Sequence, residues 1–337
     1  CDLGTFRTRL VRSVRHGSVF IPPVGMVRRW SFGDSAPALR DARCVRLARP
    51  YGVAHEIEEA APVRLLLDMR HVASRRIAHR CHCAIAQSPK LGRVDGAGLL
   101  ADIAYPDAKG PFPAILSVHG GRWRGGSKTD RSTIDVKQWA GFGFFAMSID
   151  YRLVGCTPAP ACYQDLQCAI RFLHAHAKDY PIDTNRIFLI GQSAGGHMVS
   201  LAGTLGDGPF KRTGGWNEQS NDFRGVISVA ANYELTTLDW GKLWNPPGED
   251  ADAARRLASP VNHVHSRMKP ILVIHSDDDK SVPVRQAFDM VQALDKAKVK
   301  HRFVHYKDKG HMGITPDVIK EARAFIRETS TRADDNR

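Results

Sequence analysis

A serine in a Gly-x-Ser-x-Gly pattern has the surroundings of a nucleophile. Ser193 lies between Gly191 and Gly195, after the short apolar run at 186–190 and before a run at 196–204 that can form a helix. A strand, a sharp turn and a helix in this order lift a serine hydroxyl clear of a sheet. The two glycines leave room where a side chain would clash. N–H groups at the start of the helix point at any oxyanion formed there.

The base and the acid that such a serine needs both follow predicted strands later in the chain. His311 follows the strand predicted at 301–306, and three consecutive aspartates at 277–279 follow the strand predicted at 271–275. His311 would take the proton of Ser193, and one carboxylate would fix the imidazole tautomer. Three adjacent carboxylates cannot all be buried and ionised. The candidates for the buried acid are Asp277, Asp278 and Asp279.

A glycine-rich loop early in the chain is placed to bind an oxyanion. Residues 119–126 (HGGRWRGG) follow the strand predicted at 114–119. Oxyanion holes of this type combine backbone N–H groups after an early strand with that of the residue after the nucleophile. The predicted donors are therefore the N–H groups of Gly121, Arg122 and Ala194.

The remaining hydrophobic pattern predicts the elements that position these residues. Strands are expected at 99–105, 114–119, 144–149, 186–190, 225–230, 271–275 and 301–306, and helices at 134–140, 161–178, 196–204, 284–297 and 316–327. Because strands alternate with helices, we expect an α/β fold with a mostly parallel central sheet and helices on both faces. Residues 206–260, rich in aromatic side chains, are expected to form a small cap-like insertion over the site.

The first quarter of the chain differs from the rest in composition. Residues 1–90 carry fifteen Arg, one Lys and seven acidic residues, a net charge of +9 out of +13 for the whole chain. We expect a poorly ordered or atypical extension at 1–93, a catalytic domain at 94–330 and a tail at 331–337. Because the catalytic part is nearly balanced in charge, we expect no nucleic-acid partner.

The cysteines and the hydropathy predict neither a metal site nor a membrane span. Cys81-His82-Cys83 lacks a second ligand pair at zinc-finger spacing, so no metal and no cofactor are expected. Cys156 and Cys162 flank a proline-rich loop and could pair or stay buried thiols. No apolar stretch is long enough for stable membrane insertion, and no signal peptide is visible, which favours a cytoplasmic location. The chain is expected to act as a monomer or homodimer.

Taken together, these motifs resemble those of serine carboxylesterases of the α/β-hydrolase fold, in the lineage of feruloyl-esterase-like enzymes and hormone-sensitive-lipase relatives. The resemblance covers about residues 95–328. The motifs that carry it are His119-Gly120-Gly121-x-Trp123, Asp150-Tyr151-Arg152-Leu153, Gly191-Gln192-Ser193-Ala194-Gly195-Gly196-His197 and Asp279-x-x-Val282-Pro283 followed by Gly310-His311. In that family the acid usually lies four residues before the proline, which implies Asp279. Arg122, in place of a third glycine, favours the feruloyl-esterase-like branch.

The resemblance implies a serine esterase that hydrolyses small carboxylic esters, among them aryl or feruloyl-type esters, through an acyl-enzyme. Its catalytic triad would be Ser193, Asp279 and His311. The pocket candidates are Trp123, Gln192, His197 and Tyr233, although the aromatic residues among them could equally be ordinary core. The family positions matched by Asp150, Arg152 and Asp165 are usually structural.

Two other functions stay open at this point. An arylformamidase-type amidase stays open because it uses the same triad and a similar loop. A non-catalytic ligand-binding homologue on the same fold would typically have lost a member of the triad, and this chain keeps all three. A peptidase of the prolyl-oligopeptidase type usually carries a large propeller domain, which the first ninety residues cannot supply.

Overall fold

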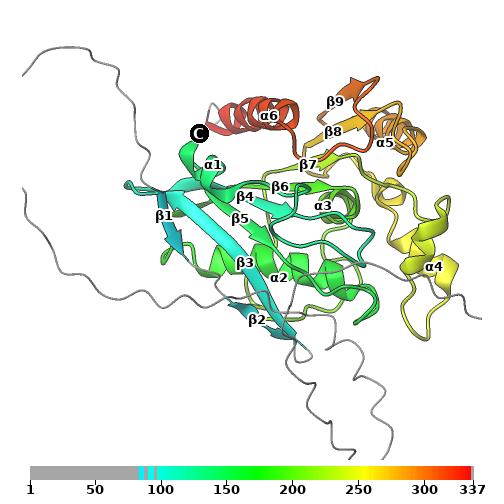
Figure 1. Cartoon of the computed structure of the whole chain (residues 1–337), viewed down its shortest axis with the longest axis horizontal. Coiled ribbons are helices and arrows are strands. Elements are labelled where there is room, and N and C mark those ends of the chain that lie inside the picture. The colour runs from blue at the N-terminus through cyan, green and yellow to red at the C-terminus, as the bar shows by residue number, and fades with distance from the viewer. Residues whose placement is uncertain (1–82, 87–89, 95–96, 335–337) are drawn as a thin grey trace, which may run out of the picture. The chain divides into compact units, whose positions relative to one another are not determined.

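The computed structural model of the chain describes residues 83–86, 90–94 and 97–334. Most of the predicted extension at 1–93, including Cys81 and His82, lies outside the described residues. Figure 1 shows the described part as a twisted sheet between two layers of helices.

Nine strands in the described part form one sheet, in the order β1-β3-β5-β4-β6-β7-β8-β9, with β2 paired to β3. They are β1 (Cys83–Ala86), β2 (Lys90–Val94), β3 (Ala97–Pro106), β4 (Phe112–Val118), β5 (Phe145–Ile149), β6 (Ile182–Gln192), β7 (Gly225–Val229), β8 (Ile271–Ser276) and β9 (His301–Tyr306). All pairings from β5 to β9 along this order are parallel, whereas β3 is antiparallel to β5. The predicted α/β fold with a mostly parallel sheet is therefore confirmed.

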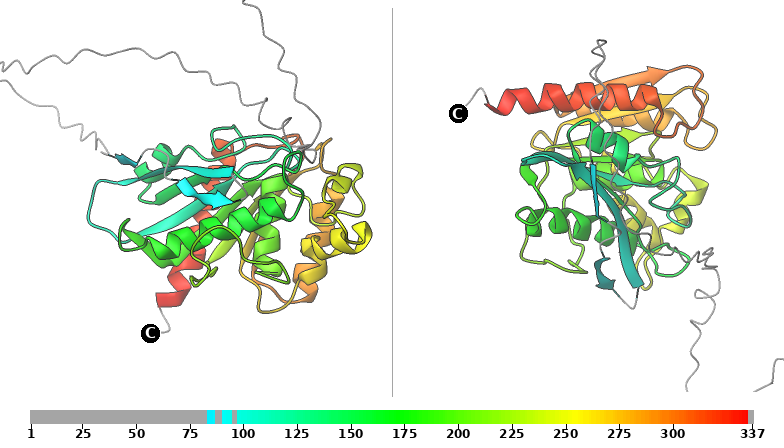
Figure 2. Two further views of the ribbon diagram at one scale, coloured as in Figure 1. Left: turned by 90° about the horizontal axis from the view of Figure 1, so that it is seen from below. Right: turned by 60° about the vertical axis from the view of Figure 1, so that its left-hand side comes forward.

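Helices cover both faces of the sheet, and each face has its own apolar core. The helices are α1 (Val136–Gly141), α2 (Ala161–Ala175), α3 (Ala194–Thr204), α4 (Ala251–Leu257), α5 (Arg285–Lys296) and α6 (Pro316–Asp334), with 3-10 turns η2 (Asp239–Leu243) and η3 (Pro260–His263). Figures 1 and 2 show α1 and α6 on one side of the sheet and α2 and α3 on the other. Side chains along β6 alternate between the two cores: Ile187 and Leu189 join α2, α3 and α5, while Phe188 and Ile190 join α1 and α6.

Two parts of the predicted domain plan need correction. The sheet includes β1 and β2, so it begins before the boundary predicted at residue 94. These strands are short, and their sequences carry no sustained alternation of apolar and polar residues, the signal on which strand prediction depends. The range predicted for the insertion, 206–260, also includes β7, which the sequence itself predicts as a strand at 225–230. The irregular segment with η2, α4 and η3 is confined to the chain between β7 and β8.

A buried ion pair ties the chain after β5 to α2. Arg152 Nη2 lies 2.8 Å from Asp165 Oδ1, and the two side chains are only 4% and 1% exposed. The backbone N–H of Arg152 also donates to Asp165 Oδ2 at 2.7 Å. Nearby, Asp150 accepts the N–H of Lys128 at 2.8 Å, which links the loop after β4 to the end of β5. These contacts are structural, as the resemblance implies for all three residues.

We predict that Asp165→Asn lowers the free energy of unfolding by about 3–5 kcal/mol, because it leaves the buried Arg152 charge unpaired. Urea unfolding at pH 7 measures this change. The control is Asp289→Asn, which breaks the exposed Arg285–Asp289 pair, whose side chains are 77% and 40% exposed. That change should cost less than about 1 kcal/mol. Equal costs for the two variants would contradict the assignment of Arg152–Asp165 as a structural pair.

Three histidines are buried: His119 after β4, His197 on α3 and His275 on β8. Burial lowers the pKa of each. His197 on α3 is completely buried, and its pKa falls to about 4. Its Nε2–H donates to the carbonyl oxygen of Ala258 at 2.7 Å. Its ring lies edge-on to two tryptophans, with centroids 5.0 Å from Trp123 and 5.2 Å from Trp244.

The buried His197 predicts a loss of stability in mild acid. Its pKa is about 4 when folded and about 6.5 when unfolded. The unfolded chain therefore binds more protons between these values, and stability falls as the pH drops through this window. His197 alone should lower the free energy of unfolding by about 2 kcal/mol between pH 7 and pH 5. His197→Asn should flatten this part of the profile, with His305→Asn as the exposed control. An unchanged profile in His197→Asn would contradict the prediction.

Candidate active site

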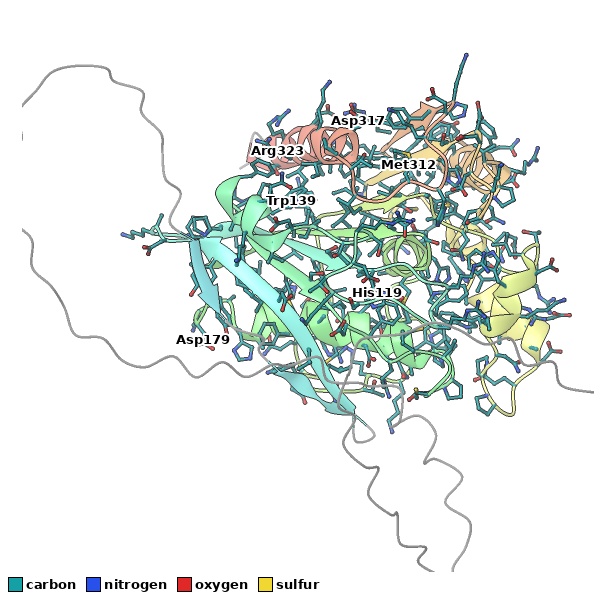
Figure 3. All side chains as sticks on the ribbon, viewed as in Figure 1. His119, Trp139, Asp179, Met312, Asp317 and Arg323 are labelled. Atoms are coloured by element: carbon teal, nitrogen blue, oxygen red, sulfur yellow. The ribbon has the colours of Figure 1, made fainter. Side chains whose placement is uncertain are left out.

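The predicted site residues come together at the carboxyl ends of the parallel strands. Val118, the last residue of β4, pairs with Gly191 near the end of β6. On the other side, the last residues of β8 and β9, Ser276 and Tyr306, pair with each other. The loops after these four strands therefore open on the same edge of the sheet, where open α/β sheets bind their ligands. His119 and Met312, labelled in Figure 3, mark two of these loops.

Ser193 occupies a sharp turn between β6 and α3. Its backbone has φ 53° and ψ −119°, a strained conformation for a residue with a side chain. Its N–H donates to the carbonyl oxygen of Val229 at 2.8 Å. A Cβ on Gly195 would lie 2.1 Å from the Val118 carbonyl oxygen, and one on Gly191 would lie 2.3 Å from the Gly195 carbonyl oxygen. Both predicted glycine positions thus exclude a side chain.

His311 and Asp279 form a hydrogen-bonded pair beside this turn. His311 Nδ1 lies 2.8 Å from Asp279 Oδ2, and because a carboxylate only accepts, Nδ1–H is the donor. The other oxygen, Oδ1, accepts the N–H groups of Ser281 at 2.8 Å and Val282 at 2.9 Å. Burial, the largest single effect, raises the pKa of Asp279. The hydrogen bonds from His311 and Val282 outweigh it and lower this pKa below its ordinary value. The acid is therefore held ionised.

The three consecutive aspartates have different partners. Only Asp279 contacts His311, and it is 6% exposed. Asp278 is exposed and accepts the Ser276 hydroxyl and the Gly310 N–H, each at 2.7 Å, which lowers its pKa. Asp277 pairs with His305 at 2.7 Å on the exposed side of β9. The geometry thus separates one buried carboxylate from two exposed ones.

His275, which the sequence did not single out, lies behind the Asp279 carboxylate. Its Nε2–H donates to the Val282 carbonyl oxygen at 2.9 Å and lies 3.5 Å from Asp279 Oδ2. Burial lowers its pKa, which favours the neutral ring. A histidine at the end of the strand that leads into the acidic loop was the available signal.

Gln192, a predicted pocket residue, contacts the base directly. Its amide Nε2–H₂ donates to His311 Nε2 at 3.1 Å and to the Met312 carbonyl oxygen at 2.8 Å. The two ring nitrogens of His311 thus have opposite roles, with Nδ1 as donor and Nε2 as acceptor. Among the described residues, the Ser193 hydroxyl makes no hydrogen bond, so the structure places it in the same cleft as His311 without a direct bond.

The loop after β4 has an unusual backbone at the predicted oxyanion donors. Gly121, Arg122 and Trp123 all have positive φ, at 105°, 53° and 56°. Within the described part of the chain, the N–H groups of Gly121, Arg122 and Ala194 donate to no protein acceptor. Ala194 is the first residue of α3, where helix N–H groups have no partner inside the helix. Three donors without a protein acceptor thus lie on the loop that lines the Ser193 cleft and at the start of the helix after Ser193.

Neighbouring residues hold this loop in shape. The His119 ring stacks on Tyr151, with centroids 4.0 Å apart, and its Nδ1–H donates to the Gly120 carbonyl oxygen at 2.7 Å. The Tyr151 hydroxyl donates to the same oxygen at 3.1 Å. The Gly120 N–H donates to the Ser132 hydroxyl at 3.2 Å. The strained backbone is thus fixed from several sides before any ligand binds.

Ser193 and His311 line a cleft of about 320 Å³. The complete lining is Gly121, Arg122, Arg124, Arg131, Ser132, Gln192, Ser193, Trp240, Ser281, His311 and Gly313. Trp240, from η2, is the aromatic side chain in this lining, and its Nε1–H donates to the Ser281 carbonyl oxygen at 3.3 Å. A larger hollow of about 460 Å³ opens beside α1 and shares Arg131 with the cleft, but Ser193 and His311 do not line it.

Three of the four predicted pocket residues do not line the cleft. Trp123, His197 and Tyr233 are completely buried. The Tyr233 hydroxyl lies 2.8 Å from that of Ser228 inside the core. Trp123 points inward because its positive φ turns the side chain toward His197 and Trp244. For Trp123, adjacency in sequence to the oxyanion loop was therefore misleading, and all three side chains are buried in the core.

Neither a metal cluster nor a membrane span occurs in the described part of the chain. Among these residues no group of three or more His, Cys, Asp or Glu side chains could hold a metal ion. None of the described helices has the length and apolar character needed to cross a bilayer. Cys162 is a free buried thiol, so the suggested pairing of Cys156 with Cys162 does not form.

The comparison with known proteins agrees with the geometry. The probable carboxylic ester hydrolase LipM of Mycobacterium tuberculosis is 27% identical over 229 residues, which are 65% of this chain and 52% of LipM. Esterase LipC of the same organism is 28% identical over 200 residues, 55% of this chain and 48% of LipC. The chain thus spans about half the length of the curated relatives it matches.

A solved structure and a family profile complete the comparison. A truncated carbohydrate esterase from gut microbiota superimposes with a TM-score of 0.64, covering 75% of this chain and 99% of that one, at 22% identity. This likeness establishes the α/β-hydrolase fold. The BD-FAE family model matches residues 101–294, more than half of the chain. The chain therefore belongs to the BD-FAE family.

Proposed function

We propose that this protein is a serine esterase that hydrolyses small carboxylic esters through an acyl-enzyme, with Ser193, His311 and Asp279 as its catalytic triad. The observation that carries the proposal is the arrangement of the cleft. Ser193 stands at a strained turn beside His311, whose Nδ1–H is bound to the buried carboxylate of Asp279. The family and the names of the relatives support the same class of reaction.

In the first half of the reaction, the Ser193 oxygen attacks the ester carbonyl carbon while His311 Nε2 takes the hydroxyl proton. The Asp279 carboxylate keeps Nδ1 protonated and stabilises the imidazolium that forms. In the free protein Nε2 is occupied by the amide of Gln192, so this amide must yield to the Ser193 hydroxyl. His311 then returns the proton to the leaving alcohol.

The oxyanion of the tetrahedral intermediate would bind the free N–H groups of Gly121, Arg122 and Ala194. Donors that are already fixed in place need no reorganisation at the moment of reaction, and each is worth about 3 kcal/mol of transition-state stabilisation. In the second half, water attacks the acyl-enzyme with His311 as the base, and Ser193 is released.

The cleft supports a small substrate. Its volume of about 320 Å³ lies at the lower end of the range for small-molecule sites. The exposed part of Trp240 offers an aromatic surface for an aryl group, which favours aryl or feruloyl-type esters among the candidates. The same triad could cleave an arylformamide, so both ester and amide substrates belong in the test.

We predict that Ser193→Ala lowers kcat by roughly 10⁴- to 10⁶-fold, because the triad acts as a unit. The assay compares p-nitrophenyl esters, methyl ferulate and N-formylkynurenine with wild type and variant. A fluorophosphonate probe should label Ser193 alone. Labelling at another serine would overturn the assignment, and turnover of N-formylkynurenine alone would favour the amidase.

We predict that Asp279→Asn lowers kcat by on the order of 10⁴-fold, because His311 loses the partner that sets its tautomer. Asp277→Asn and Asp278→Asn are the matched controls, since each removes one exposed charge from the same loop. Both should keep at least about a tenth of the activity, because an exposed charge acts only through a screened field. A larger loss of kcat in Asp278→Asn than in Asp279→Asn would show that the acid is Asp278 and not Asp279.

A further inference from the structure

The cleft that contains Ser193 is lined by three arginines and by no carboxylate. Arg122, Arg124 and Arg131 are exposed to solvent, and all three line the cleft together with Ser193 and His311. They lie within ten residues of one another in the loop after β4.

The three arginines have no carboxylate partner among the described residues. Many other described arginines do form such pairs: Arg152, Arg186, Arg212, Arg255, Arg285 and Arg302. The guanidinium of Arg122 instead lies 5.7 Å from the centre of the Trp240 ring, which keeps its charge at the cleft. We call Arg122, Arg124 and Arg131 the cationic wall of the cleft, and its charges are available to a ligand.

The nearby acidic groups are already engaged. Asp130 accepts the N–H and the hydroxyl of Ser127, and Asp102 pairs with Lys128 at 2.9 Å. Asp279 faces away from the cleft, with both oxygens bound to His311 and the backbone. None of these carboxylates lines the cleft, so the side chains that line it carry three guanidinium charges and no carboxylate.

A hydrogen bond joins Arg131 to the loop after β9 that carries His311. Its backbone carbonyl oxygen accepts the N–H of Ile314 at 3.2 Å, three residues after His311. Arg122 lies on the loop after β4 that carries two of the proposed oxyanion donors, and it lines the same cleft. Arg122 and Arg131 thus come from two parts of the loop after β4 and line the cleft together with Ser193 and His311.

We propose that this esterase selects esters that carry a second, anionic group, such as a free carboxylate, on the acyl or the alcohol part. The inference rests on the proposed function and names its substrate class. A guanidinium matches a carboxylate with two parallel hydrogen bonds and keeps its charge at any physiological pH. A wall of one sign also raises the local concentration of an oppositely charged substrate. The reaction itself is unchanged: water cleaves the ester to an acid and an alcohol.

Two pairs of substrates test the inference. Monoethyl adipate against diethyl adipate places the anion on the acyl part. The second pair, 4-acetoxybenzoate and its methyl ester, places the anion on the alcohol part. We expect kcat/KM to be about tenfold higher for the anionic member of at least one pair at low salt. This preference should shrink several-fold in about 0.5 M NaCl, because salt screens exposed charges.

The variant is the double substitution Arg124→Gln with Arg131→Gln, which spares the proposed oxyanion donor Arg122. It should lower the ratio of anionic to neutral kcat/KM about fivefold or more. The control is Arg256→Gln with Arg267→Gln, which removes the same charge from exposed arginines that do not line the cleft. This control should keep the wild-type ratio. Fluorophosphonate labelling counts intact sites in each preparation.

The outcomes separate the two proposals. Ser193-dependent hydrolysis with no anionic preference, or a preference that the cleft variant retains, overturns the inference and leaves the proposed function standing. Absence of any hydrolysis overturns the proposed function. In that case titration calorimetry of monoethyl and diethyl adipate with the Ser193→Ala protein decides the inference, which requires tighter binding of the monoester and loss of this difference in the cleft variant.

Discussion

The close contact between Gly195 and the carbonyl oxygen of Val118 is the constraint on which the site depends. A Cβ at position 195 would lie 2.1 Å from that oxygen, so only glycine allows α3 to start this close to β4. The contact brings the turn at Ser193 against the loop after β4. As a result, Gly121 and Arg122 line the same cleft as Ser193, and Ala194 follows Ser193 at the start of α3.

The register of the parallel sheet extends this arrangement to the acid and the base. Because β8 and β9 end side by side at Ser276 and Tyr306, the loops that follow them must meet. Burial then selects among the side chains on these loops. Asp279 is the aspartate whose two oxygens find donors inside the protein, and the exposed Asp277 and Asp278 are bound at the surface. The proposed triad is thus a consequence of strand order, register and local burial.

The parts of the structure that a local pattern encodes could be predicted from the sequence. Seven strands were predicted within a few residues. Strands β4 to β8 are largely buried, and a buried parallel strand has a dense apolar run in its sequence. The pairing of Asp279 with His311 was also expected, but only because the family spacing chose among three adjacent aspartates. Strands β1 and β2 were missed, because an edge strand held by backbone pairing needs no apolar alternation.

The lining of the cleft was the least predictable part of the site. Trp123 has a positive φ, and this one dihedral turns its ring into the core instead of the cleft. Tyr233 and His197 are buried by packing from η3, α3 and the chain around Trp244, contacts between distant parts of the sequence. Conversely, Arg124 and Arg131 line the cleft because the loop after β4 borders it together with Ser193. Such long-range contacts leave no periodic signal in the chain.

Two charges near Ser193, those of Asp279 and Arg122, bear on the charge separation of the proposed reaction. Attack by Ser193 would turn a neutral pair into an imidazolium at His311 and an oxyanion near Arg122. The ionised Asp279 lies on the imidazolium side, where burial leaves its field poorly screened. Arg122 belongs to the loop of the proposed oxyanion donors, where exposure to solvent weakens its field. A negative charge behind the base and a positive charge on the oxyanion loop would both favour the same separation, so Arg122, one of the three arginines proposed to attract an anionic substrate, would also assist the chemistry.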